Sequence, residues 1–167
     1  MFVVTAVGFF AYWVLADPTY EESPEQSEWV YVLGFSGTLL SLAFALPRYA
    51  FTVGGRWVRR LSLLAAAGIG AASVANVVED GFGVSWIFFI TAGSTAIALC
   101  ALVTLAAVIA AGKRGRHRLL AVVPLATAAA IVFFVAAGGV IMLATWLTAA
   151  GVAVARRKTT RVRLQHT

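Results

Sequence analysis

Long apolar stretches, separated by short polar ones, organise this chain from end to end. The apolar stretches cover residues 1–16, 29–47, 61–78, 86–112 and 119–155. About 20 consecutive apolar residues are enough for a helix to cross a lipid bilayer. We therefore predict a helix that enters the membrane over each stretch. The first, 1–16, is short for a full crossing.

The last apolar stretch decides the number of helices. It contains 37 residues without a charge, from Leu119 to Ala155. As one helix it would be about 55 Å long, against a hydrocarbon core of about 30 Å. We therefore predict two helices, 119–136 and 138–155, with a hinge at 136–139, where paired glycines permit a tight reversal.

Local signals predict where the other helices end. Pro47 followed by Arg48 is expected to end the second helix, because proline interrupts helical hydrogen bonding. The segment 48–60 alternates basic and aromatic residues, which is typical of a segment in the headgroup layer. The first stretch ends in a sequence similar to a signal-peptidase site, but no basic residue precedes it. We expect it to be retained, and a native start upstream of Met1 would supply a cytoplasmic tail.

Charge indicates how the helices are oriented. The seven acidic residues lie in 17–28 and 79–80, whereas the thirteen Lys and Arg lie in 48–60, 113–118 and 156–163. Cytoplasmic loops of membrane proteins are enriched in Lys and Arg. We therefore predict an all-α, polytopic integral membrane protein of one domain, 1–167. It would be a six-transmembrane-helix bundle in the plasma membrane, with both termini and the basic tail 156–167 cytoplasmic.

Composition supports the membrane class. Hydrophobic residues make up 61% of the chain and charged residues 12%, against about 25% charged in soluble domains. A net charge of +6 would suggest nucleic acid in a soluble protein. Here the basic residues adjoin apolar spans, so we expect anionic lipid headgroups as their partners and no nucleic acid. The composition is typical of a prokaryotic protein. The expected headgroup residues are Arg56, Arg59, Arg60, Lys113, Arg114, Arg116, Arg118, Arg156, Arg157 and Lys158.

Small residues recur at helical spacing and predict packing faces. Small side chains allow close approach of helix backbones in lipid. The pattern leaves open whether these faces pack within the bundle, against a second copy or against another membrane protein. The predicted packing residues are Gly34, Thr38, Ser41 and Ala45 on one helix, with Gly68 and Ala72 on the next.

Polar residues near the predicted outer ends of two helices are candidate solute contacts. Thr91, Ser94 and Thr95 share a helix face, and Asn76 lies one turn before Glu79 and Asp80. These groups could converge at the outer mouth of the bundle and contact a cation or polar solute. The alternative is structural, because Ser and Thr hydroxyls also bond to carbonyls of their own helix.

The predicted spans lack the groups that membrane catalysis requires. No charged residue lies inside them, although such residues mark proton relays and ion paths. The histidines, His117 and His166, lie in a basic loop and the tail, and Cys100 is the single cysteine. Paired haem ligands and a nucleophile–base pair are therefore missing from the spans. We expect no metal, no cofactor and no enzymatic activity.

Two hypotheses of function follow from these patterns. The first is a noncatalytic membrane subunit that assembles with, stabilises or regulates a larger membrane complex. The alternative is a carrier or substrate-binding module for an uncharged or amphipathic small solute, using the polar residues near the outer mouth. A third possibility is an enzyme acting on lipid at the membrane surface through Glu79 and Asp80.

Overall fold

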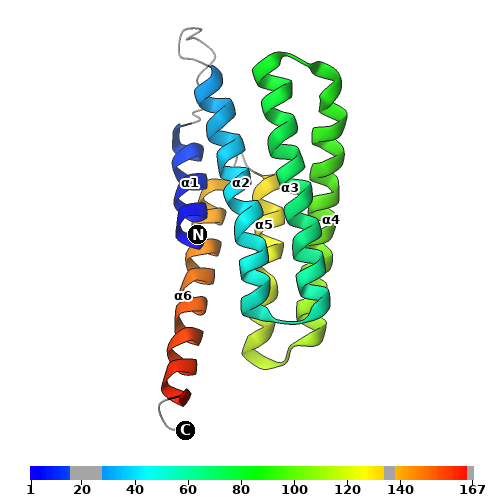
Figure 1. Cartoon of the computed structure of the whole chain (residues 1–167). Helices are drawn as coiled ribbons and strands as arrows, with labels where there is room; N and C mark the ends of the chain where they lie inside the picture. Colours follow the sequence, from blue (N-terminus) through cyan, green and yellow to red (C-terminus); the bar gives the residue numbers. More distant parts are fainter. Residues whose placement is uncertain (16–27, 134–137, 165–167) are drawn as a thin grey trace.

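The computed structural model describes residues 1–15, 28–133 and 138–164, and its regular elements are helices (Figure 1). This confirms the all-helical prediction for the described part of the chain. The acidic segment 17–27 lies outside the described residues. The elements are α1 (Phe2–Leu15), α2 (Glu28–Val53), α3 (Arg56–Phe82), η1 (Ser85–Ile87), α4 (Phe88–Gly112), η2 (Gly115–Ala121), α5 (Val122–Val132) and α6 (Gly139–Leu164).

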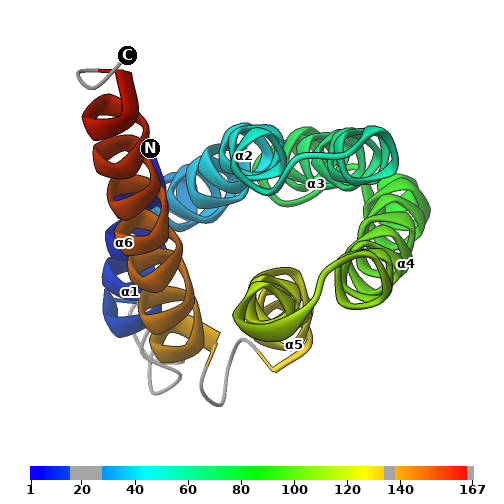
Figure 2. The ribbon, with the colours of Figure 1, turned by 90° about the horizontal axis from the view of Figure 1, so that it is seen from below.

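Successive α-helices run in opposite directions and lie side by side (Figure 1). The helix α3 packs along both α2 and α4, whereas α6 packs mainly against α1. The short helix α5 contacts α4 on one side and α6 on the other. Viewed along the helices, the order around the bundle follows the order in the chain (Figure 2). Each apolar helix therefore covers part of its neighbours' apolar surface.

Three of the helices are long and apolar enough to cross a membrane. The qualifying segments are Val32–Val53, Arg56–Asp80 and Ser85–Gly112. The described apolar parts of the other helices, Phe2–Val14, His117–Val132 and Gly139–Val154, are shorter, at 10–17 residues. The structure thus supports a membrane location through three spans.

The prediction that α2 ends at Pro47 is wrong, because α2 continues through Pro47 to Val53. Tyr49 and Val53 in this last part are buried, and the Tyr49 hydroxyl donates to the Leu120 carbonyl. The Arg48 guanidinium donates to the Phe44 carbonyl at 3.3 Å, beside the turn that the proline interrupts. Neighbouring groups of this kind can compensate for proline inside a membrane helix.

The segment 48–60 also differs from the expected surface-lying segment. It forms the end of α2, a turn at Gly54 and Gly55, and the first turn of α3. The two glycines have φ angles of 76° and 110°, which residues with a Cβ rarely adopt. Because the turn is so short, α3 begins at Arg56 instead of the predicted residue 61. At its other end, α3 extends to Phe82 instead of the predicted residue 78.

The 37-residue apolar tract is divided between two helices. Helix α5 ends at Val132 and α6 begins at Gly139, so the tract does not form one rod. Within the predicted hinge, Ala136 and Ala137 lie outside the described residues. A Cβ on Gly139 would overlap the side chain of Trp13, so this glycine permits close packing of α6 on α1. Helix α6 continues past the predicted end at 155, to Leu164.

An aromatic contact joins three helices at the centre of the core. Trp146 of α6 is fully buried, with its ring centroid 5.4 Å from that of Phe2 and 6.2 Å from that of Tyr49. Its indole nitrogen has no hydrogen-bond partner among the described residues. Trp146 therefore packs α1, α2 and α6 together.

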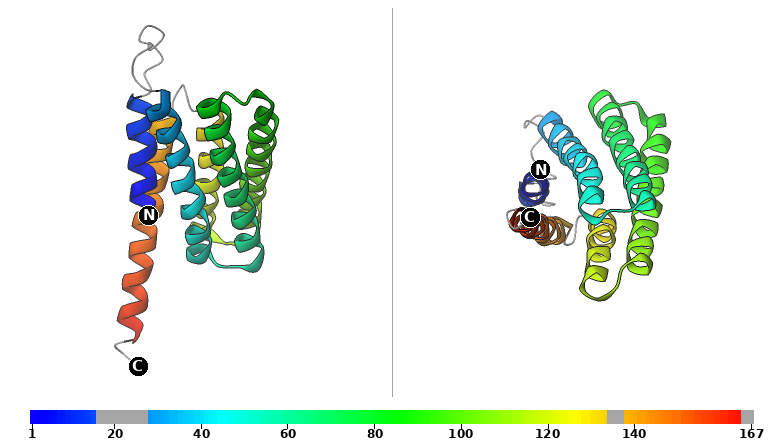
Figure 3. Two further views of the ribbon diagram at one scale, coloured as in Figure 1. Left: turned by 45° about the horizontal axis from the view of Figure 1, so that its top comes forward. Right: turned by 60° about the horizontal axis from the view of Figure 1, so that its bottom comes forward.

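The described charged residues are sorted to opposite ends of the bundle. The α2–α3 turn and the α4–η2 connection lie at the lower end in Figure 1, and the α3–α4 connection lies at the upper end. The same separation is visible from a second direction (Figure 3). Helix ends at the lower side carry Arg56 and Lys113, and the upper end carries Glu79 and Asp80. Successive helices run in opposite directions, and basic and acidic connections alternate along the sequence. The basic connections therefore lie at one end of the bundle and the acidic connection at the other.

Candidate functional site

A hydrogen bond connects α3 and α4 at the acidic end of the bundle. The Thr91 hydroxyl donates to a carboxylate oxygen of Glu79 at 2.9 Å. The two residues meet because Gly83, whose φ of 67° is left-handed, caps the end of α3, and the short helix η1 then reverses the chain into α4. This is the one pair of predicted solute contacts that a described hydrogen bond between side chains brings together.

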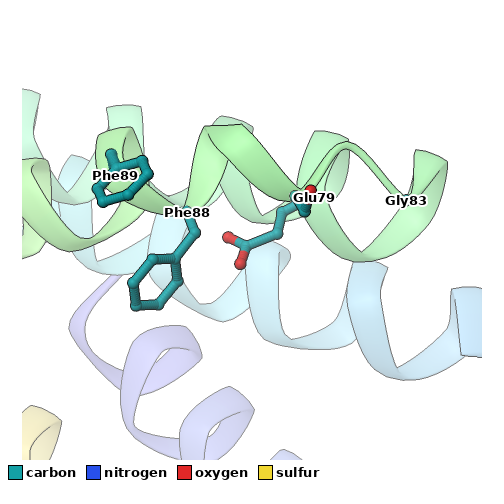
Figure 4. A pocket seen from close by; sticks show the side chains of 5 residues that line it. Glu79, Gly83, Phe88 and Phe89 are labelled. Carbon is teal, nitrogen blue, oxygen red and sulfur yellow. The ribbon is translucent and has the colours of Figure 1, made fainter.

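A shallow recess of about 450 Å³ lies beside this pair. It is lined by Glu79, Gly83, Ser85, Phe88 and Phe89, and Figure 4 shows the Glu79 carboxylate on the same side as the Phe88 ring. The phenylalanine side chains are 55% and 77% exposed. A carboxylate beside open aromatic rings provides contacts for a cation or an amphipathic molecule.

Asn76 does not join this recess and belongs to the contact between α2 and α3. Its side-chain amide donates to the Ser36 hydroxyl at 3.4 Å, and the Ser73 hydroxyl donates to the Ser36 carbonyl at 2.7 Å. All three residues are buried. Ser36 and Ser73 were not among the predicted residues, although Ser73 precedes Asn76 by the three residues that place side chains on one helix face. Asp80 is exposed and does not line the recess.

The hydroxyls of Ser94 and Thr95 bond to carbonyls of α4 itself. Ser94 donates to the Ile90 carbonyl at 2.6 Å, and Thr95 donates to the Thr91 carbonyl at 2.7 Å. These bonds use the hydroxyl protons within the helix, which is the structural alternative for such residues. Among the six predicted contacts, described side-chain bonds join Glu79 to Thr91, whereas Asn76, Ser94 and Thr95 bond elsewhere, and contact of the six with a solute stays a prediction.

The predicted packing residues lie in contacts within this chain. A Cβ on Gly68 would stand 2.7 Å from the Ser94 carbonyl oxygen, and one on Gly34 would stand 3.2 Å from the Tyr12 ring. On α2, Ala45 and Thr38 are buried and the Ser41 carbonyl accepts the Thr5 hydroxyl at 3.2 Å. On α3, Ala72 is buried. These faces hold α1, α2, α3 and α4 against one another.

A second set of small residues, which the sequence analysis missed, lies on the outside of α4. The set recurs at steps of three and four residues, so it forms one stripe along the helix. All its members are exposed, because α3 and α5 cover other sides of α4. We call this stripe the outer α4 face: Gly93, Ala96, Cys100, Thr104, Ala107 and Ala111. The signal in the sequence was the spacing of these small residues among the larger side chains of α4.

The expected headgroup residues lie where chain ends and turns leave the bundle. Arg56, Arg59 and Arg60 form the first turns of α3 and are exposed. Arg114 and Arg118 follow α4 and are also exposed, whereas Lys113 is partly buried. The backbone at 116 and 156–158 is helical, and the side chains of Arg116, Arg156, Arg157 and Lys158 lie outside the described part.

Within residues 1–15, 28–133 and 138–164, no group of three or more His, Cys, Asp or Glu side chains is placed to hold a metal ion. No protein-family model, curated protein or solved structure matches the chain.

Proposed function

We propose that this protein spans the membrane six times, with the basic end of the bundle and both termini in the cytoplasm. Helices α2, α3 and α4 supply three spans by length and composition. The remaining helices α1, α5 and α6 each run antiparallel to their neighbours in the chain, and the apolar part of α6, Gly139–Val154, continues into the basic residues before its end at Leu164. The positive-inside rule supports the orientation, since the basic turns lie together at one end. A plasma-membrane location in a prokaryotic cell fits the same reasoning.

Within that membrane, the proposed function is that of a noncatalytic subunit that assembles with another membrane protein or with a second copy of itself. The observation that carries it is the outer α4 face. Lipid tails are as apolar as leucine, so helices gain little by hiding apolar side chains from lipid. They associate where small residues let two backbones approach closely. The 25-residue helix α4 offers that approach along its stripe of small residues, beside which Ile97 and Val103 are also exposed.

The outer α4 face differs from the other small-residue faces in having no helix of this chain described against it. The packing residues on α2 and α3 already contact neighbouring helices of the chain, as the close approach at Gly68 illustrates. The outer α4 face has no described helix against it. It therefore remains free to receive a helix from a partner.

Substitutions on two helices test the proposal. Ala96→Leu with Ala107→Leu places bulk on the outer α4 face, and Ala67→Leu with Ala71→Leu places the same bulk on an exposed face of α3. The protein is extracted in a mild detergent, and its mass and co-purifying chains are measured for each variant. We expect the α4 pair to lose the partner or the oligomer and the α3 pair to retain it. A wild-type protein that is monomeric and brings down no partner refutes the proposal.

Cross-linking through Cys100 distinguishes the two kinds of partner. This cysteine is exposed on the outer α4 face and is the single cysteine of the chain. If the partner is a second copy packed symmetrically, mild oxidation in membranes should give a disulfide-linked dimer. If the partner is another protein, no such dimer forms, and the co-purifying chain protects Cys100 from a lipid-soluble maleimide.

The second candidate function is binding of a small solute in the recess at Glu79. It is supported by the Glu79–Thr91 hydrogen bond and the open rings of Phe88 and Phe89. Glu79→Gln should then weaken solute binding, whereas Asp80→Asn, which removes the same charge outside the recess, should not. Equal effects of the two variants would mean that binding depends on the overall surface charge and not on the recess.

A further inference from the structure

The turn between α2 and α3 combines arginines with exposed aromatic rings. The Arg59 guanidinium lies 4.9 Å from the Phe51 ring centroid. The guanidiniums of Arg56 and Arg60 lie 5.9 Å and 5.3 Å from the Trp57 ring centroid. We call these five residues the basic turn. They place three positive charges on two rings within a few residues of one another.

Local geometry explains this arrangement. Arg56, Arg59 and Arg60 are spaced by three and four residues, so they share one face of the first turns of α3. The left-handed glycines Gly54 and Gly55 let α3 start directly after α2 ends, which brings Phe51 under Arg59. A longer connection would separate the ring from the guanidinium.

The charges of the basic turn are not neutralised by described carboxylates. Glu79 and Asp80 lie at the other end of α3. Arg59 and Glu79 are 20 residues apart, which corresponds to about 30 Å along a helix. The first turn of α3 contains no acidic residue, and its N-cap, Gly55, has no side chain to cap it. Stacking on a ring orients a guanidinium and leaves its N–H donors free for an anion. The turn therefore presents ordered donors with no carboxylate beside them among the described residues.

The aromatic rings indicate where this turn sits. Phe51 is 66% exposed and Trp57 is 57% exposed. Aromatic side chains at the end of a membrane helix are typical of the layer between hydrocarbon and water. The guanidiniums on those rings then lie at the depth of lipid phosphates. The basic residues after α4 differ, because Arg118 donates to the Lys113 carbonyl at 3.1 Å.

We propose that the basic turn is a binding site for the phosphate of an anionic phospholipid headgroup. The proposal rests on the membrane orientation given above, which places this end in the cytoplasmic leaflet. Planar guanidiniums bind phosphate oxygens through paired hydrogen bonds, with geometry that an ammonium group does not offer. An anionic lipid is favoured over a zwitterionic one, because the ammonium of a zwitterionic headgroup competes with the arginines for its phosphate.

The test measures binding of short-chain phosphatidylglycerol, short-chain phosphatidylcholine and inorganic phosphate to the purified full chain in detergent. We expect wild type to prefer phosphatidylglycerol over both other ligands. The triple variant R56Q/R59Q/R60Q should weaken phosphatidylglycerol binding roughly tenfold or more. The comparison variant K113Q/R114Q/R118Q removes the same charge from the neighbouring basic segment, which also faces headgroups, and should weaken the affinity clearly less than the first triple does.

A second variant set keeps the test informative if the triple glutamine variant fails to fold. R56K/R59K/R60K retains the charge and loses the planar donors, so it should bind the lipid more weakly than wild type. Trp57→Leu retains every arginine and should lower the affinity by removing the ring that orders two of them.

Three results would overturn the proposal. Equal losses of phosphatidylglycerol affinity in the two triple glutamine variants would mean that binding depends on net charge and not on the basic turn. Equal affinity for the two lipids would remove the headgroup selectivity. Affinity for inorganic phosphate equal to that for phosphatidylglycerol would indicate a soluble anion in place of a lipid. None of these results alters the partner assay on the outer α4 face, so failure of the lipid site and failure of the subunit function are distinguishable.

Discussion

The contact at Gly68 offers the sharpest test of how the bundle packs. A methyl group added there would stand 2.7 Å from the carbonyl oxygen of Ser94 and 3.1 Å from the Cβ and the backbone nitrogen of Ala98. Ordinary contacts of a Cβ begin at 3.4 Å, so the methyl group is about 0.7 Å too close to the oxygen. That oxygen belongs to the backbone of α4 and cannot move by changing a rotamer.

Gly68→Ala therefore has to separate α3 from α4 or distort one of them. Overpacking of this kind costs about 1–3 kcal/mol. The substitution also changes the intrinsic helix propensity, by about 1 kcal/mol in favour of alanine. Gly70→Ala provides the control, because it lies on the same helix and a Cβ there meets no atom within 4 Å. Comparing the two variants cancels the propensity, so Gly68→Ala should be less stable by about 1–3 kcal/mol.

Thermal unfolding of the two purified variants in the same detergent measures this difference. For a chain of this length the expected difference in midpoint is roughly 3–10 °C. Gly68→Ala should cost less when added to the Ala98→Gly variant than when added to wild type, because the Ala98 Cβ is then absent while the Ser94 oxygen stays in place. Equal midpoints for Gly68→Ala and Gly70→Ala would show that α3 and α4 do not approach closely at this residue.

Substitutions at three further positions test other parts of the bundle, each by the same unfolding measurement. Tyr49→Phe removes the donor to the Leu120 carbonyl and should cost about 1 kcal/mol, and an unchanged midpoint would contradict that bond. Trp146→Ala should cost about 3–5 kcal/mol, and Trp146→Phe should cost much less, because the indole N–H has no described partner to lose. Gly55→Ala should cost about 1–3 kcal/mol because of the φ of 110°, and a neutral result would mean that the α2–α3 turn has another conformation.

Some of the candidate site was readable from spacing, and some was not. Glu79 and Thr91 were both predicted contacts, and they meet at 2.9 Å. Asn76 was placed with them because it lies one turn before Glu79, yet its amide donates to Ser36 on α2. Spacing along one helix gives the angle between two side chains around that helix. It does not tell which neighbouring helix lies on each side.

The chain's hydropathy and charge determined that it is helical, that it is suited to a membrane, and that the apolar tract 119–155 divides into two helices. These properties depend on local composition and on length, because backbone groups in lipid must be satisfied within the helix. The continuation of α2 through Pro47, the inward position of Gly68 and the exposed stripe on α4 were decided by the tertiary structure. Each of these depends on which surfaces two helices bury against each other, and residues distant in the sequence supply the opposing surface.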